Sequence, residues 1–187
     1  MAELIIIAGD QPPGFPCDFT QTGANPIEIG ALRQLRKSEA FCRKRAVVLE
    51  IGGRIAGMAL GYKLSPTGET PKLTGLCQSL RPIATLEGRP EASFYVNTIA
   101  VYPEYQHHGL GAVLLAELEA KARRAHCSCL LMEVTAANHG AMRFYERHGF
   151  TLWPETRRRS VVILQKDFVP AILHAPYVQT ERSQRAS

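Results

Sequence analysis

The clearest hydrophobic pattern lies in the second half of the chain. Apolar residues recur every four positions from Leu110 to Ala122, which predicts a helix over 109–125. The segments on either side, 93–102 and 128–135, are nearly continuous apolar runs, as is typical of buried strands. Strand, helix and strand in this order predict two parallel strands at the centre of an α/β sheet.

Further elements follow this unit. The segment from Asn138 to Gly149 opens on a residue suited to a helix N-cap and closes on a glycine suited to the position after a helix, which predicts a second helix. Residues 159–168 predict a final strand, and 169–187 form a polar tail. We therefore expect one domain over 1–168 followed by this tail.

The first half of the chain is patterned less clearly. Apolar runs at 46–50 and 54–62, separated by a turn with two glycines, predict a β-hairpin. Residues 27–45 have apolar positions at helical spacing, and 3–8 are typical of a short buried strand. Proline and glycine interrupt 63–92 throughout, which indicates a long loop or insertion.

Composition agrees with a globular domain. The chain has 187 residues, of which 45% are hydrophobic and 21% charged, and this excludes collagen-like and wholly disordered classes. Its five cysteines are an odd number at irregular spacing, which favours free thiols in a reducing compartment. Because no apolar run is long enough for a membrane span and no signal-peptide pattern is present, we expect a soluble, cytoplasmic protein.

Net charge narrows the class of partner only partly. The formal charge is +5, and residues 139–187 carry 8 basic and 4 acidic side chains against 14 and 13 in residues 1–138. An anionic partner near the C-terminal third is therefore expected. Nucleic acid, a membrane surface and a phosphorylated small molecule all agree with charge alone.

The segment that joins the first buried strand to the long helix carries the most informative chemistry. It places Gly109 and Gly111 at the helix N-terminus, where unpaired backbone N–H groups and the helix dipole form an anion site suited to phosphate. The alternative is a turn that uses glycine for geometry alone. A dinucleotide-binding motif would need a third glycine, and a P-loop would need Gly-Lys-Ser/Thr; both are absent.

Two motifs resemble one known family. The pattern Gln106-x-x-Gly109-x-Gly111-Ala112 resembles the acyl-CoA signature of the GNAT superfamily of N-acetyltransferases. Downstream, Asn138-x-x-Ala141-x-x-x-Tyr145-x-x-x-Gly149-Phe150 is similar to the family's second helix. The resemblance is close over 93–150, loose over the flanking strands and absent over 63–92. It implies a single α/β domain with a mixed central sheet and helices on both faces.

The resemblance also implies a co-substrate and a site. Acetyl-CoA, or another short acyl-CoA, would donate its acyl group directly to a primary amine of a small molecule or peptide in a ternary complex. Backbone groups of Ile99 and Val101 would pair with the pantetheine arm, and the Val101 N–H would polarise the thioester carbonyl. The residues expected to bind the co-substrate are Ile99, Ala100, Val101, Gln106, His107, His108, Gly109, Leu110, Gly111, Ala112, Asn138, Ala141, Tyr145 and Arg147.

Two of these residues could have a purely structural role instead. Tyr145 would lie near the sulfur, but it could instead pack in the core beside Phe144 and Phe150. A tyrosine has a pKa of about 10 and a thiol of about 8.5, so complete proton transfer to the thiolate is uphill by about 2 kcal/mol. We therefore expect Tyr145 to stabilise the thiolate largely by hydrogen bonding. Asn138 could equally be a plain helix N-cap.

The sequence offers several candidates for the base that deprotonates the acceptor amine. The family often has a carboxylate on the strand before the signature, where this chain has Tyr95 and Asn97. Glu133 on the neighbouring strand could act through water, as could His107 or His108. The lack of a carboxylate at positions 95 and 97 also raises the alternative of a non-catalytic acyl-CoA sensor or scaffold.

The remaining motifs do not predict a metal site or a nucleic-acid-binding site. His126-Cys127-Ser128-Cys129 has no second ligand pair at zinc spacing, so no metal site is expected. Arg157-Arg158-Arg159 lacks the interleaved aromatics or recognition helix that nucleic-acid binding would need, and a nucleic-acid-associated domain rests on charge alone. By analogy with relatives whose edge strands pair between subunits, a homodimer is one expected assembly.

Overall fold

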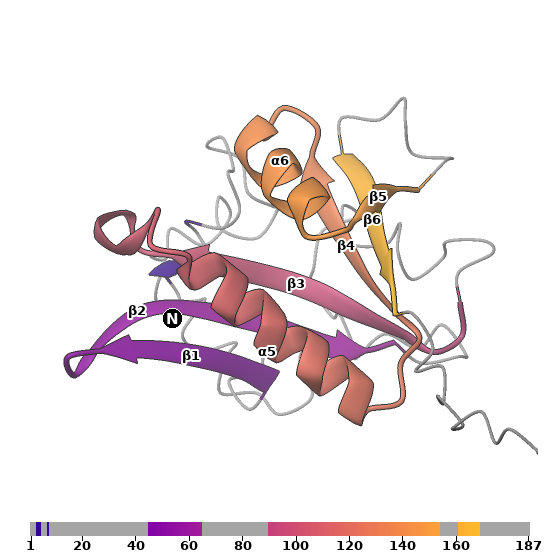
Figure 1. The fold of residues 1–187 in the computed structure, drawn as a ribbon, viewed down its shortest axis with the longest axis horizontal. Helices are drawn as coiled ribbons and strands as arrows, with labels where there is room; N and C mark the ends of the chain where they lie inside the picture. Colours follow the sequence, from indigo (N-terminus) through magenta and orange to yellow (C-terminus); the bar gives the residue numbers. More distant parts are fainter. Residues whose placement is uncertain (1–2, 5–6, 8–44, 65–89, 154–160, 169–187) are drawn as a thin grey trace, which may run out of the picture.

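The computed structural model describes residues 3–4, 7, 45–64, 90–153 and 161–168. These residues form six strands, two α-helices and one short 3-10 helix (Figure 1). In chain order the elements are β1 (Ala46–Ile51), β2 (Arg54–Lys63), β3 (Ser93–Val101), η3 (Pro103–Tyr105), α5 (Leu110–Arg124), β4 (Cys129–Thr135), α6 (His139–Arg147), β5 (Thr151–Leu152) and β6 (Val161–Asp167).

The strands form one mixed sheet in the order β1-β2-β3-β4-β6-β5. Among the described strands, β3 and β4 make the one parallel pair, and every other neighbouring pair is antiparallel. Helix α5 connects the parallel pair, because parallel neighbours need a long crossover. This confirms the mixed α/β sheet with a central parallel pair that the hydrophobic pattern predicts.

Helices α5 and α6 pack on one face of the sheet, and Leu4, a helical residue near the N-terminus, packs on the opposite face. Leu114, Leu115 and Leu118 of α5 and Tyr145 of α6 belong to one buried cluster with side chains from β2, β3, β4 and β6. In Figure 1 α5 crosses in front of β2 and β3, while α6 lies beside the end of β4. The opposite face has a second cluster, which includes Tyr62, Tyr95 and Leu131. The sheet therefore separates two apolar layers.

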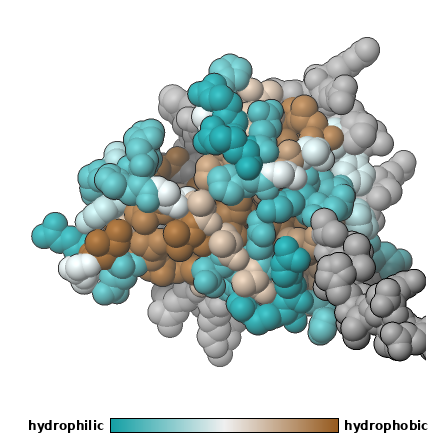
Figure 2. All heavy atoms as spheres, in the orientation of Figure 1, coloured by the Kyte–Doolittle hydropathy of each residue, from teal (hydrophilic) through white to brown (hydrophobic). Residues whose placement is uncertain are grey.

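The β1–β2 hairpin turns where the two glycines predict it. Gly52 and Gly53 have φ angles of 57° and 76°, in the left-handed region that favours glycine. Ile51 and Ile55 beside this turn are 43% and 40% exposed. Figure 2 shows apolar atoms gathered at this end of the molecule. Apolar side chains of both β1 and β2 are thus exposed to solvent beside the hairpin turn.

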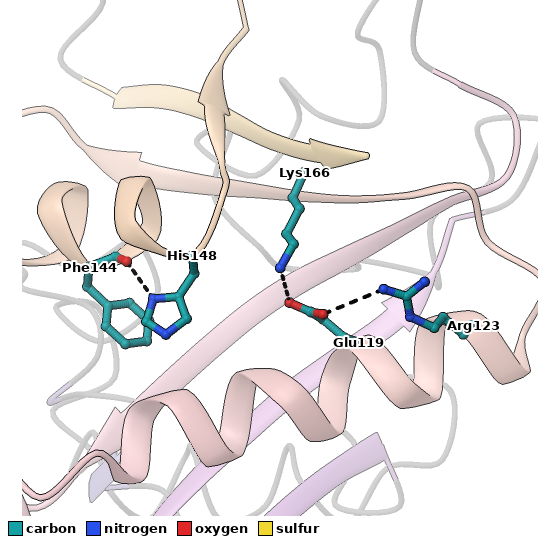
Figure 3. Close-up of polar contacts among 5 residues, drawn as sticks. All are labelled: Glu119, Arg123, Phe144, His148 and Lys166. Atoms are coloured by element: carbon teal, nitrogen blue, oxygen red, sulfur yellow. Dashed lines mark hydrogen bonds and ion pairs between the residues drawn. The ribbon is translucent and has the colours of Figure 1, made fainter. Parts of the chain in front are cut away.

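A charged contact joins α5 to strand β6. Glu119 on α5 accepts a hydrogen bond from Lys166 Nζ of β6 at 2.5 Å, and its other carboxylate oxygen lies 3.8 Å from Arg123 (Figure 3). The guanidinium of Arg123 also stacks over the Phe168 ring at 4.1 Å from its centroid. These contacts join the C-terminal half of α5 to β6 and to the residue that follows it.

The structure corrects one sequence prediction and leaves another outside its range. Glu3, Leu4 and Ile7 are helical, so the strand predicted for 3–8 is wrong for these residues. A short apolar run is compatible with either conformation, and periodicity cannot separate them at that length. The helix predicted for 27–45 falls almost entirely outside the described residues, as does most of the loop over 63–92. The short elements η3 and β5 have no signal in the hydrophobic pattern.

Candidate active site

The two parallel strands pair over only part of their length. Ser93–Val96 of β3 pair with Cys129–Met132 of β4, but β3 continues to Val101 and β4 to Thr135 without further pairing between them. Figure 1 shows the two strands diverging beyond this point. The part of β3 over 97–101 therefore has one edge that β4 does not cover, which we call the open edge of β3.

A β-bulge lies at the point of divergence. On β2, Leu60 pairs with Thr98 and the next residue, Gly61, pairs with Val96, so Asn97 is an extra residue in β3. A bulge bends its strand and increases the local twist, which turns β3 away from β4. Gly61 permits the close approach, since a Cβ there would lie 2.9 Å from the Tyr95 carbonyl oxygen.

Backbone geometry indicates which groups face the open edge. The N–H of Tyr102 donates to the Ala56 carbonyl of β2 at 2.9 Å. Alternate residues of a strand direct their N–H groups to opposite edges, so those of Ile99 and Val101 point away from β2. The Val101 carbonyl agrees with this direction, because it accepts a hydrogen bond from Gln106 Nε2 at 3.0 Å. Ile99 and Val101 thus offer polar backbone groups along the open edge.

The N-terminus of α5 lies directly after this strand and presents free amides. The first helical bonds are donated by Ala112 and Val113 to the Gly109 carbonyl, at 3.0 and 3.3 Å. Within the described part of the chain, the N–H groups of residues 107–111 therefore remain without acceptors, as expected at a helix N-terminus. Gln106 N already donates to the Pro103 carbonyl at 3.2 Å. Five consecutive backbone N–H groups, those of residues 107–111, are thus left available at the start of α5 among the described residues.

Local conformation explains how this turn exposes its amides. Gly109 is the helix N-cap with a φ angle of 78°, and His107 also has a positive φ, of 63°. The first turn contains no acidic side chain, and no side chain caps the helix. The partial positive charge of the helix N-terminus is therefore not neutralised by a described side chain. His107 and His108 are exposed, and His108 Nδ1 lies 2.6 Å from the Gln106 carbonyl oxygen.

Helix α6 packs beside this turn. A Cβ added at Gly111 would lie 3.5 Å from the Phe144 ring, so the first turn of α5 and the middle of α6 are in contact. The Asn138 side chain accepts a hydrogen bond from the Ala141 N–H at 2.9 Å, which makes Asn138 the N-cap of α6. Ala141 packs at the edge of the core, while Arg147 is exposed in the last turn. The two sequence motifs are thus brought together in space.

Tyr145 is a buried residue of α6. It is 6% exposed, and its ring makes edge-to-face contacts with Phe144 and Phe150 at centroid distances of 5.0 and 5.4 Å. Tyr145 therefore packs in the core beside Phe144 and Phe150, which is the structural alternative given above for this residue. Its hydroxyl makes no hydrogen bond to another described residue, so it can donate one to a ligand. Burial raises the pKa of Tyr145 well above its ordinary value.

A polar cluster lies on the sheet face opposite α5. Tyr62 of β2 pairs in register with Tyr95 of β3, and their rings meet edge to face at 5.5 Å. Tyr95 in turn pairs with Leu131 of β4, and Glu133 follows two residues later on the same face. Sequence reasoning singled out Tyr95, Asn97 and Glu133 but missed Tyr62. The one sequence signal for Tyr62 is its spacing of two residues from Leu60 and four from Met58, which places all three on the same face of β2.

The buried tyrosines predict the protein's behaviour in alkali. Burial raises the pKa of Tyr62 to about 12 and also raises the pKa of Tyr95 and Tyr145 above the ordinary value of about 10. The folded state then retains protons that the unfolded state releases above pH 10, so stability is complete below about pH 10 and falls as the pH rises further. Denaturant midpoints at increasing pH should show this decline. Phenolate absorbance should show these three groups ionising with unfolding; full ionisation of the native protein near pH 10 would contradict the prediction.

The described residues contain no group of three or more His, Cys, Asp or Glu side chains placed to ligate a metal ion. Cys127 and Cys129 are buried, and Cys129 Sγ lies 3.4 Å from Ser93 Oγ. None of the described helices combines the length and the apolar character needed to span a bilayer.

Comparison with known proteins agrees with the fold and the motifs. A mixed sheet with a diverging parallel pair, and a free helix N-terminus beside it, defines a class of α/β protein suited to holding an extended anionic ligand. The family model described as Acetyltransferase (GNAT) family matches residues 17–150, which is more than half of the chain. The chain therefore belongs to the GNAT family of acetyltransferases.

Solved structures share this fold at low sequence identity. One is a crystal structure of an acetyltransferase, with 22% identity, a TM-score of 0.62 and coverage of 89% of this chain and 92% of that chain. An N-acetyltransferase from Staphylococcus aureus Mu50 has 16% identity, a TM-score of 0.62 and coverage of 88% and 92%. The PaiA N-acetyltransferase from Thermoplasma acidophilum, in complex with coenzyme A, has 15% identity, a TM-score of 0.53 and coverage of 88% and 91%. Comparison with curated proteins gives no match.

Proposed function

We propose that this protein is an N-acetyltransferase that moves an acetyl or other short acyl group from acyl-CoA directly to a primary amine within a ternary complex. The observation that carries the proposal is the open edge of β3 leading into the free amides of residues 107–111. The first feature suits an extended amide-containing arm, and the second suits a pyrophosphate. Coenzyme A contains both groups in this order.

The described residues fit such a co-substrate. A pyrophosphate at the N-terminus of α5 would meet the N–H groups of residues 107–111 without a carboxylate nearby in the first turn. The pantetheine arm would run from Val101 toward Asn97 and pair with the backbone of Ile99 and Val101. Ala100, whose backbone faces β2, would contribute packing alone. Arg147, exposed on α6, would meet the remaining phosphate.

The proposed chemistry is acyl transfer between sulfur and nitrogen. The neutral amine attacks the thioester carbonyl carbon, a C–N bond forms, and the C–S bond breaks as the electron pair passes to sulfur. The backbone N–H of Val101 would stabilise the negative charge that develops on the carbonyl oxygen. Tyr145 would donate a hydrogen bond to the departing thiolate. The proton lost by nitrogen balances the proton that the thiolate finally gains.

Release of free CoA thiol from acetyl-CoA tests this proposal. With a broad panel of amines present, we expect release that depends on one class of amine, together with a product heavier by one acetyl group. The matched control is the same reaction without amine. Binding of acetyl-CoA without turnover on any amine would contradict the enzyme and favour a sensor or scaffold module. Failure to bind acetyl-CoA would overturn the whole proposal.

A further inference from the structure

His108 lies in the turn that carries the free amides of residues 107–111, and its ring is fixed to that turn. Its Nδ1 atom lies 2.6 Å from the Gln106 carbonyl oxygen. A carbonyl oxygen and the next amide nitrogen share one carbon and lie roughly 2.2 Å apart, so Nδ1 is within about 5 Å of the His107 amide nitrogen. The imidazole is therefore held beside the first of the amides proposed to bind the pyrophosphate.

The same contact determines which ring nitrogen gains or loses a proton. A carbonyl oxygen only accepts hydrogen bonds, so Nδ1 carries a hydrogen in both the neutral and the charged ring. Nε2 then has a lone pair in the neutral ring and an N–H in the charged ring. A phosphate oxygen is also an acceptor, so the lone pair repels it and the charged N–H attracts it.

Gln106 is itself held in place, so the carbonyl that orients the His108 ring has a fixed position. The Gln106 N–H donates to the Pro103 carbonyl at 3.2 Å, and its side-chain Nε2 donates to the Val101 carbonyl at 3.0 Å. These two bonds join Gln106 to the helix η3 and to the end of β3. The His108 ring is thus tied, through Gln106, to the two elements that precede the turn.

The charged groups of the adjoining elements nearly balance one another. Among the described residues His108 forms no ion pair, the first turn of α5 contains no acidic side chain, and β3 contains no charged one. Helix η3 contributes one exposed carboxylate, that of Glu104. Besides the neighbouring His107, the titratable or charged side chains in and directly after α6 are those of His139, Arg143, Tyr145, Glu146, Arg147 and His148. Two arginines therefore offset two carboxylates, and these elements supply no net negative charge that would keep the ring protonated before an anion binds.

We propose that His108 couples binding of the pyrophosphate to the uptake of one proton from solvent at Nε2, so that affinity for CoA and acyl-CoA rises as the pH falls. This inference rests on the proposed function, because it needs a pyrophosphate at the free amides of α5. The bound anion stabilises the protonated ring, and by linkage the protonated ring stabilises the bound anion to the same extent. Affinity is therefore highest below about pH 6 and declines to that of the neutral ring by about pH 8, across the range in which histidine ordinarily titrates.

Binding of 3′-dephospho-CoA at two pH values tests the coupling. This compound retains the pyrophosphate but lacks the 3′-phosphate, whose own second ionisation near pH 6 would obscure the result. We expect its Kd for the full-length protein, measured by calorimetry, to be about three- to tenfold lower at pH 6 than at pH 8. Equal Kd values at the two pH values would overturn the proposal.

His108→Asn assigns the coupling to one side chain. The asparagine NH2 group can donate to the Gln106 carbonyl in place of Nδ1, but no group remains that gains a proton near neutral pH. This variant should therefore bind 3′-dephospho-CoA with the same Kd at both pH values. His126→Asn is the matched control, because His126 is also exposed and has a positive φ of 54°, but lies just beyond the opposite end of α5. It should keep the wild-type pH dependence.

Proton uptake provides a second measurement, which applies to CoA itself. Calorimetric titrations in two buffers of different ionisation enthalpy give the number of protons bound together with the ligand. Near pH 7 the wild type and His126→Asn should take up a larger fraction of a proton with CoA than His108→Asn does. Thermal unfolding shows that each variant is folded. Equal proton uptake by the wild type and folded His108→Asn would contradict the assignment to His108.

The same samples separate this inference from the proposed function. CoA binding and thiol release by a wild type whose Kd for 3′-dephospho-CoA does not change with pH would leave the proposed function intact and contradict the coupling. A lower kcat for His108→Asn at saturating acetyl-CoA, with the pH dependence of Kd unchanged, would indicate a general base instead. Failure of the wild type to bind CoA would contradict the proposed function.

Discussion

Replacement of Tyr145 by phenylalanine should lower kcat by about a hundredfold while leaving the Kd for acetyl-CoA nearly unchanged. The ring makes the packing contacts with Phe144 and Phe150, and phenylalanine retains them. Only the hydroxyl is lost, and it has no hydrogen bond to another described residue. Steady-state rates of thiol release and calorimetric titration with acetyl-CoA provide the two measurements.

The raised pKa of Tyr145 specifies how its hydroxyl acts. Burial holds the phenol proton more tightly than in water, so full transfer to a thiolate is less favourable than the ordinary pKa values indicate. The hydroxyl should therefore stabilise the leaving sulfur as a hydrogen-bond donor, and the rate should show no Tyr145 ionisation below about pH 10. Tyr102→Phe is the control, because its hydroxyl bonds Glu3 at 2.9 Å on the surface. Equal kcat for the two variants would refute this role.

Replacement of Gly109 by valine should weaken acetyl-CoA binding at least about tenfold while the protein stays folded. Gly109 has a φ of 78°, which a β-branched residue adopts only with strain, and relief of that strain would redirect the amides of the turn. A Cβ at this position meets no atom within 4 Å, so the expected effect comes from the backbone and not from a steric clash. Calorimetry with acetyl-CoA measures the loss.

The hairpin provides a matched control for this substitution. Gly53 has a φ of 76° and also has open space around its Cβ position, but it belongs to the β1–β2 turn. Gly53→Val should therefore lower the unfolding free energy by a similar amount, about 1–2 kcal/mol, without affecting acetyl-CoA affinity. If Gly109→Val and Gly53→Val bind acetyl-CoA equally well, the α5 turn does not hold the pyrophosphate.

Local sequence pattern was sufficient for the elements around the site. The four-residue spacing from Leu110 to Ala122 and the cap residues at Asn138 and Gly149 act within one or two turns of chain, and the observed helices agree with them closely. The glycine turn between β1 and β2 is equally local. The amide cradle at Gly109 follows from the same kind of information, because every helix N-terminus leaves its first N–H groups unpaired.

Contacts between strands could not be predicted from the sequence and were found only in the tertiary structure. The bulge at Asn97 depends on how β3 registers with β2, and the divergence of β3 from β4 depends on that bulge. The grouping of Tyr62, Tyr95 and Glu133 depends on register across three strands, since a shift of one residue would move each side chain to the other face. These residues are separated by tens of positions along the chain, and no local periodicity links them.

The amino-acid sequence was thus enough to identify the α/β class, the two helices and the family to which the chain belongs, because these depend on short-range spacing. The tertiary structure decided which edge of β3 lies open and that the Tyr145 ring is buried in the core. It also placed a carboxylate among tyrosines on the opposite face of the sheet. Each of these features arises from the register and packing of elements that are distant in the chain.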